Sequence, residues 1–164
     1  GQCFRTPRSE SGQERAALMS EKRVVLLVGT GRVGAEFAKA IVERGCFSLR
    51  VLVRATTSEA KVEAMRGMGA EVVVGSTSDP DSLRKACHGV TTVVSAIHGF
   101  ADPEGQLFLP QVALMRAARD MGVEQFIPSE YGTVARDGVP EGIPVCEAKR
   151  RVGEAAAELA KESG

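Results

Sequence analysis

The sequence predicts an α/β fold built on a doubly wound parallel sheet. Short runs of apolar, mostly β-branched residues recur along the chain, and segments with helical apolar spacing alternate with them. Uninterrupted apolar strands are typical of a parallel sheet that helices cover on both faces. The alternating order also implies right-handed crossovers between the strands. We expect strands at 24–28, 49–53, 71–74, 91–97 and 124–127.

Residues that begin and end helices lie between these strands. Ser58 and Asp79 are N-cap types, and Pro80 suits the first position of a helix. Gly45 is the kind of residue that closes a helix in the left-handed conformation. We therefore expect helices after Gly34, after Ser58, from Asp79 to Gly89, over 106–121 and from about Pro144.

The overall composition argues against several classes of binding partner. The 21 basic and 21 acidic residues give a formal net charge of +0, which argues against binding to nucleic acid or to an anionic membrane surface. No apolar run approaches the length of a membrane span. The four cysteines lie far apart without metal-ligand spacing, so we expect no metal site and reduced thiols in a cytoplasmic protein.

The stretch on which the other predictions depend joins the first strand to the first helix. Gly29, Gly31 and Gly34 have the G-x-G-x-x-G spacing directly after a buried strand. The first glycine permits a tight turn, the second lets a pyrophosphate approach the backbone, and the third lets helix and strand pack closely. A glycine turn with a purely structural role is the alternative. The dinucleotide interpretation assigns cofactor binding to Gly29, Thr30, Gly31, Arg32, Val33 and Gly34.

Two further positions extend this cofactor site. Arg54 ends the second strand, where NAD-binding folds usually carry an acidic residue for the ribose 2′-hydroxyl. Its guanidinium suits a 2′-phosphate instead, which predicts NADP(H); the alternative is a solvated charge at a strand end. Arg32 is a second candidate for that phosphate, or simply an exposed arginine. The carboxyl end of the fourth strand, near Ser95 and Ala96, should line the same crevice.

The expected domain organisation is a leader followed by one incomplete domain. Residues 1–18 are polar and aperiodic, and Met19 is the expected natural start. We assign 1–20 to a disordered leader, with a translation artefact as the alternative, and 21–164 to an NAD(P)-binding Rossmann domain. Another strand should follow the last helix in such an alternation. The chain is therefore expected to be a fragment.

A second constellation carries a resemblance to a known family. The strand at 124–127 runs into Pro128-Ser129-Glu130-Tyr131-Gly132, and Cys146-Glu147-Ala148-Lys149-Arg150-Arg151-Val152 lies on the last helix. Together with the glycine loop and Leu52-Val53-Arg54, these segments resemble the isoflavone-reductase-like and NmrA-like group of atypical short-chain dehydrogenase/reductases. Phenylcoumaran benzylic ether reductases belong to this group. The resemblance covers roughly 22–164, and it implies that the remaining strands and the substrate-binding part lie beyond Gly164.

The resemblance implies a function and a role for Lys149. Reductase members transfer a hydride from NADPH to a small phenolic substrate such as an isoflavone or lignan. Lys149 matches the lysine that contacts the nicotinamide ribose and takes part in proton transfer, and Arg54 matches the arginine that holds the 2′-phosphate. Other NmrA-like members bind the dinucleotide, catalyse nothing and act as redox-sensing regulators through a protein partner. That is the alternative function.

This sequence departs from the family pattern at several positions. Val28 stands where glycine is usual, Arg32 where an aromatic residue is usual, and Tyr131 where phenylalanine is common. The Tyr-x-x-x-Lys pair of typical short-chain dehydrogenases is missing, because Val145 precedes Lys149 by four residues. Judged by its neighbours alone, Lys149 lies on a solvated basic helix face. His98, a lone loop histidine after the fourth strand, is expected to be solvated, and contact with the nicotinamide half of the cofactor is the alternative. Ser129 and Glu130 are expected to be structural, fixing the turn.

Overall fold

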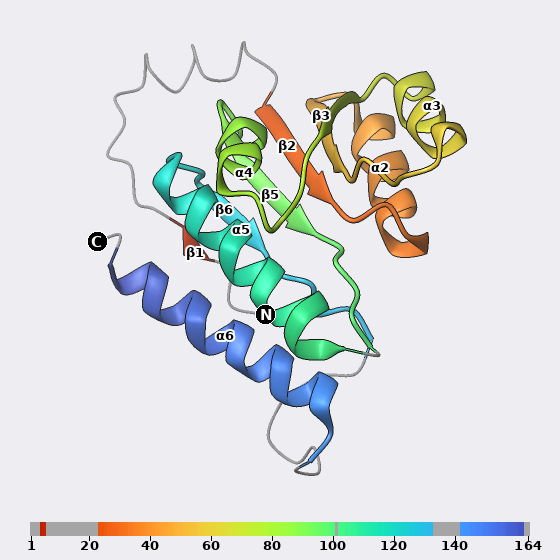
Figure 1. The fold of residues 1–164 in the computed structure, drawn as a ribbon. Helices are drawn as coiled ribbons and strands as arrows, with labels where there is room; N and C mark the ends of the chain where they lie inside the picture. The colour runs from red at the N-terminus through yellow and green to blue at the C-terminus, as the bar shows by residue number, and fades with distance from the viewer. Residues whose placement is uncertain (1–3, 6–22, 101, 133–141, 163–164) are drawn as a thin grey trace, which may run out of the picture.

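The sheet has the topology that a doubly wound fold requires. The computed structural model describes residues 4–5, 23–100, 102–132 and 142–162. The strand order is β1-β6-β5-β2-β3-β4, and the five strands from β2 onward run parallel (Figure 1). The strands are β1 (Phe4–Arg5), β2 (Arg23–Val28), β3 (Phe47–Val53), β4 (Glu71–Val74), β5 (Thr92–Ser95) and β6 (Gln125–Ile127).

Helices cover both faces of this sheet. One face carries α2 (Arg32–Arg44) and α3 (Glu59–Gly67). The other carries α4 (Pro80–Cys87), α5 (Leu109–Asp120) and α6 (Pro144–Lys161), and a π-helical turn, η1 (Glu104–Phe108), leads into α5. The α/β fold with a doubly wound parallel sheet, as predicted, is therefore confirmed.

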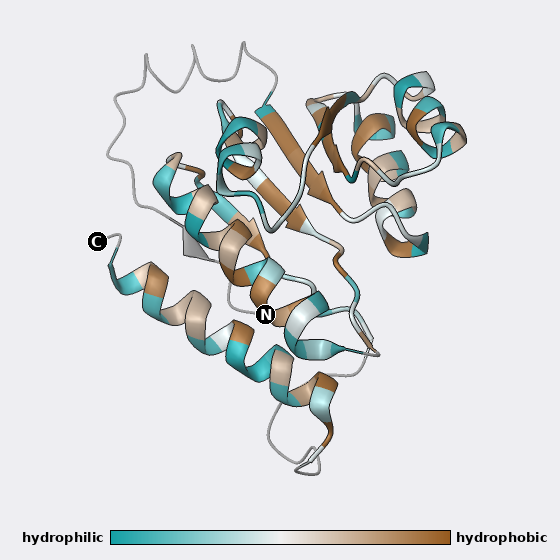
Figure 2. Ribbon diagram, viewed as in Figure 1, coloured by the Kyte–Doolittle hydropathy of each residue, from teal (hydrophilic) through white to brown (hydrophobic). Residues whose placement is uncertain are grey.

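The core is divided by the sheet into two apolar clusters. Alternate residues of β2 serve the two sides: Leu26 and Val28 pack with α4, α5 and α6, whereas Val25 and Leu27 pack with α2 and α3. Figure 2 shows β2 and β3 as mainly apolar, whereas the helices alternate between apolar and polar segments. Full burial of one such side chain contributes about 1.5–3 kcal/mol.

The site is positioned where the chain changes direction across the sheet. From β2 the chain proceeds outward to β3 and β4, and then returns to β5 on the other side of β2. Val28 pairs with Leu52 of β3 and with Ser95 of β5, so three carboxyl ends meet at one place. In open α/β sheets ligands bind outside the carboxyl ends of the strands at such a switch point.

Two elements differ from the sequence expectation. The fourth strand ends at Ser95 rather than at 97, because the amide of Ala96 makes a 2.7 Å hydrogen bond to Val28 O and β2 then turns away at Gly29. The helix expected over 106–121 begins as the π-helical turn η1. Pro110 has no N–H for a regular bond to the carbonyl of Gln106, which accounts for the irregular start.

The N-terminal segment also differs in part. Phe4 and Arg5, expected within a disordered leader, form β1 and pair antiparallel with Phe126 and Gln125 of β6. An edge strand presents unpaired backbone groups that a second segment can bond, which gives the physical reason for this pairing. The rest of the expected leader lies outside the described residues.

Candidate functional site

The glycine loop has the three local geometries that its spacing predicts. Gly29 has φ +103°, and a Cβ on it would lie 2.5 Å from Ala96 O. A Cβ on Gly34 would lie 1.8 Å from Gly29 O, so only glycine allows this contact between helix and loop. A Cβ on Gly31 would meet nothing within 4 Å. The first and third glycines therefore build the turn, and the second faces open space.

Helix α2 starts at this loop with its N–H groups unblocked. Gly31 is the N-cap and supplies no side-chain hydrogen bond, and the first turn contains no acidic residue. The first bond of the helix runs from Ala35 N to Gly31 O at 2.9 Å. The amides of Arg32, Val33 and Gly34 precede that bond and have no carbonyl partner within the helix. These amides and the helix dipole form a cradle that fits a pyrophosphate.

Two arginines lie near this cradle. Arg54 directly follows β3, and its carbonyl accepts a 2.9 Å hydrogen bond from Thr57 N that closes a turn. Because β2 and β3 are parallel neighbours in register, Arg54 leaves the sheet at the same edge as the glycine loop. Arg32 and Arg54 are both exposed, and neither forms an ion pair with any residue that the structure describes. This leaves two guanidinium groups at that edge for an anion.

The end of β5 lies against the glycine loop from the other side. Ala96 is half-buried and lies against Gly29. Ser95 is fully buried, and its hydroxyl has no hydrogen-bond partner among the described residues. Of the two predicted lining residues, only Ala96 therefore retains accessible surface. His98 is exposed as expected, and its ring stacks with Phe100 at 6.5 Å between centroids.

Lys149 lies on the buried face of α6. Lys149 is only 5% exposed to solvent, and its Nζ donates a 3.1 Å hydrogen bond to Tyr131 O. Arg150 and Arg151 next to it are exposed, so the solvated basic face that its neighbours suggest does not include Lys149. A buried ammonium is costly unless polar groups surround it. The carbonyl of Tyr131 is one such group.

The turn after β6 is held by a residue that the sequence analysis missed. Gln111, on the buried face of α5, accepts a 2.7 Å hydrogen bond from Ser129 N through Oε1. Ser129 Oγ donates to Ile97 O at 2.7 Å, so the structural role expected for Ser129 is confirmed. The one sequence signal for Gln111 is its position among apolar neighbours at helical spacing, such as Leu114, Met115 and Ala118.

Neither a membrane-spanning helix nor a metal-binding cluster occurs among the described residues. No helix there is long and apolar enough to cross a membrane. No group of three or more His, Cys, Asp or Glu side chains there is placed to hold a metal ion.

The fold and this edge together define a Rossmann-type α/β domain with a glycine loop at its topological switch point. The model of the NmrA-like family matches residues 20–163, and the chain belongs to that family. It is similar to the phenylcoumaran benzylic ether reductase PT1 of Pinus taeda, with 32% identity over 121 residues. That match covers 69% of this chain and 37% of the relative.

Solved structures give the same picture. The structure of AtPrR2 with NADP+ and (+)pinoresinol superposes with a TM-score of 0.72 at 32% identity, covering 85% of this chain and 47% of that one. The leucoanthocyanidin reductase–NADPH complex from Vitis vinifera gives a TM-score of 0.70 at 27% identity, covering 83% and 46%. The chain thus spans less than half the length of the relatives that it matches.

Proposed function

We propose that this chain is the NADP(H)-binding part of a reductase that acts on a small organic substrate. The substrate class that fits is phenolic, of the isoflavone or lignan kind, as the names of the relatives suggest. The observation that carries the proposal is the combination of an open glycine loop with a buried lysine on α6. We place the protein in the cytoplasm on the support of three free cysteines among the described residues.

Different residues at the carboxyl edge of the sheet bind different parts of the cofactor. The first amides of α2 hold the pyrophosphate, and the open face of Gly31 gives it close approach. Arg54 binds the 2′-phosphate with its planar fork of donors, and Arg32 adds a second cation. Ala96 and the glycine loop form the crevice floor. NADPH, when bound, supplies the hydride.

Lys149 has two roles in this proposal. Its Nζ hydrogen-bonds the nicotinamide ribose and passes a proton toward the oxygen that the reduction leaves charged. The contact with Tyr131 O fixes the ammonium in direction, and burial keeps bulk water from competing for it. No tyrosine from a Tyr-x-x-x-Lys pair assists, because Val145 occupies that position.

The test replaces Lys149 and measures binding and turnover separately. In Lys149→Met the apolar stem is kept, so the NADPH Kd should change by less than about tenfold, whereas NADPH-dependent reduction by the complete protein should fall about 100-fold or more. Lys161→Met, an exposed change on the same helix, is the control and should alter neither. Full turnover in Lys149→Met would contradict the role of Lys149. NADPH binding without turnover of any phenolic substrate would instead favour the non-catalytic regulator.

A further inference from the structure

Tyr131 contacts two elements of the site at once. Its carbonyl oxygen accepts the hydrogen bond from Lys149 Nζ at 3.1 Å. Its ring lies 5.0 Å from the ring of Phe37, centroid to centroid, with the planes tilted by 50°. Such a tilted pair is a favourable aromatic arrangement. Backbone and side chain of one residue therefore link α6 to α2.

Phe37 belongs to the helix that begins at the glycine loop. It is half-buried on α2 and packs against the apolar cluster that α2 and α3 share with the sheet. A helix moves as a rigid unit over one or two turns, so a displacement of its first turn also displaces this ring. Phe37 consequently connects the helix that begins at the glycine loop with the turn that holds the lysine.

The Tyr131 turn is supported from its other side by Ser129. The bonds from Ser129 to Gln111 and Ile97 fix the start of the turn against α5 and the end of β5. Tyr131 lies two residues further on, directly before Gly132, which has φ +99°. Phe37 thus supports the turn from α2, opposite to the support that α5 gives.

We propose that Phe37 is a positioning residue for Lys149. It acts through Tyr131: the ring contact sets where the Tyr131 carbonyl lies, and that carbonyl sets the direction of Nζ. Occupation of the glycine loop is thereby coupled to the placement of the lysine. The inference deepens the proposed function and rests on it for the role of Lys149 in the reduction. The coupling between the glycine loop and Lys149 depends only on contacts within the folded chain.

The experiment measures how readily the Lys149 amine is acylated by acetic anhydride, read by peptide mass spectrometry. Exposed Lys61 serves as the internal reference in the same sample. Phe37→Leu keeps an apolar side chain but removes the ring. Phe47→Leu is the matched control, because Phe47 is also half-buried against the same cluster but lies at the opposite edge of the sheet, at the start of β3. Phe37→Tyr restores a ring.

Without dinucleotide, Phe37→Leu should raise the relative labelling rate of Lys149 at least about threefold, because the ring contact that holds the Tyr131 turn, and with it the hydrogen-bond acceptor of Nζ, is lost. Phe47→Leu and Phe37→Tyr should leave it unchanged. With NADPH present, labelling should slow in the wild-type chain, and this protection should be lost in Phe37→Leu although NADPH fluorescence still reports binding.

Equal rates in Phe37→Leu and Phe47→Leu would overturn the inference. Failure of every variant and of the wild-type chain to bind NADPH would overturn the proposed function instead. The labelling comparison without dinucleotide would still decide the role of Phe37.

Discussion

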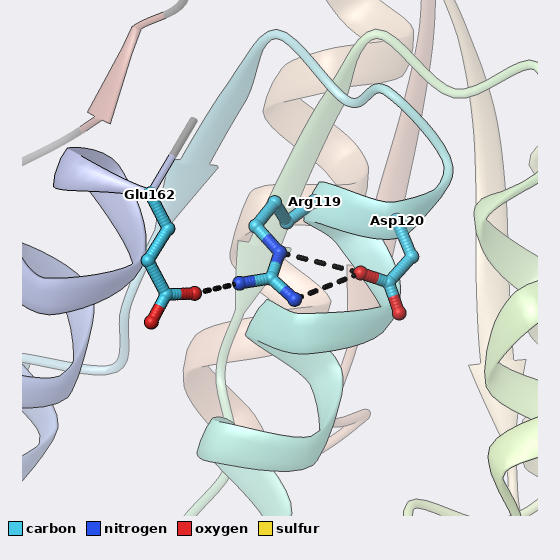
Figure 3. Close-up of polar contacts among 3 residues, drawn as sticks. All are labelled: Arg119, Asp120 and Glu162. Atoms are coloured by element: carbon cyan, nitrogen blue, oxygen red, sulfur yellow. Dashed lines mark hydrogen bonds and ion pairs between the residues drawn. The ribbon is translucent and has the colours of Figure 1, made fainter. Parts of the chain in front are cut away.

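The arginines at the two edges of the sheet differ in whether they form ion pairs. At the amino edge, Arg23 pairs with Glu124, and Arg50 pairs with Glu71 at 2.8 Å while also bonding the carbonyls of Ala86 and His88. Nearby, at the ends of two helices, Arg119 contacts both Asp120 and Glu162 (Figure 3). At the carboxyl edge, the arginines of the glycine loop and of the β3 terminus have no ion pair among the described residues.

The paired arginines at the amino edge stabilise the fold, whereas the unpaired arginines at the carboxyl edge remain available to bind an anionic ligand. A paired guanidinium has its charge neutralised within the chain, so it adds little attraction for an outside anion. An unpaired guanidinium beside free helix amides keeps its attraction. Arg151, at the carboxyl side, is one exception, because it pairs with Glu104 and lies 3.9 Å above the ring of Phe108. That contact joins α6 to η1, and its role is structural.

The largest effect on stability is expected at the glycine loop. Gly34→Ala places a Cβ where Gly29 O lies, so the loop must move, and the free energy of unfolding should fall by about 3 kcal/mol or more. Gly153→Ala is the control, because Gly153 lies inside α6 with nothing near its Cβ position. That change should stabilise by about 0.5–1 kcal/mol. Urea denaturation measures both, and equal stability of the two variants would refute the close packing.

A smaller effect is expected from alkaline pH near the amino edge. Burial raises the pKa of the Cys87 thiol to about 11, and the Arg50 guanidinium lowers it only in part. The unfolded chain loses this proton near the ordinary value of 9.0, whereas the folded chain keeps it. Because the unfolded state then binds fewer protons, stability falls as pH rises from 9 to 11, by on the order of 2 kcal/mol.

The pH effect is measured as a difference between two chains. Cys87→Ala removes the titrating group, so its stability should depend less steeply on pH across this window than that of the wild-type chain. Cys46→Ala, at an exposed cysteine, should keep the wild-type slope. Identical slopes in all three chains would show that the Cys87 thiol is not protected by the fold.

The smallest effect is expected for the surface network at Arg119. The hydrogen bond to the Asp120 carboxylate, reinforced by the charge of Glu162, raises the pKa of Arg119. Exposed pairs of this kind contribute little, so Arg119→Met should lower the free energy of unfolding only slightly, and by less than the alkaline pH effect at Cys87. The difference should shrink further in high salt. Thermal unfolding at two salt concentrations checks this, and a loss as large as that of Gly34→Ala would mean that the network is more than a surface contact.

The sequence predicted the parts of the molecule that depend on local rules. Spacing of glycines and apolar strands identified the loop, the end of the fourth strand beside it and the position of Arg54. The early end of β5 depends on where β2 turns away, which is a tertiary property. The burial of Lys149 could not be read from its neighbours, because Arg150 and Arg151 mark the same segment as basic. The role of Gln111 depends on a turn that lies far from it in the chain.

The measurement that tests the contrast between the edges most directly is calorimetric titration with NADPH and NADH. The wild-type chain, Arg54→Ala and Arg119→Ala would be compared. A bidentate, charge-assisted hydrogen bond between arginine and phosphate contributes about 1.5–3 kcal/mol to binding. Arg54→Ala should therefore weaken NADPH binding about 10- to 100-fold. Binding of NADH, which lacks the 2′-phosphate, should stay unchanged, and Arg119→Ala should affect neither. Undiminished NADPH affinity in Arg54→Ala, or an equal loss for NADH, would contradict the account.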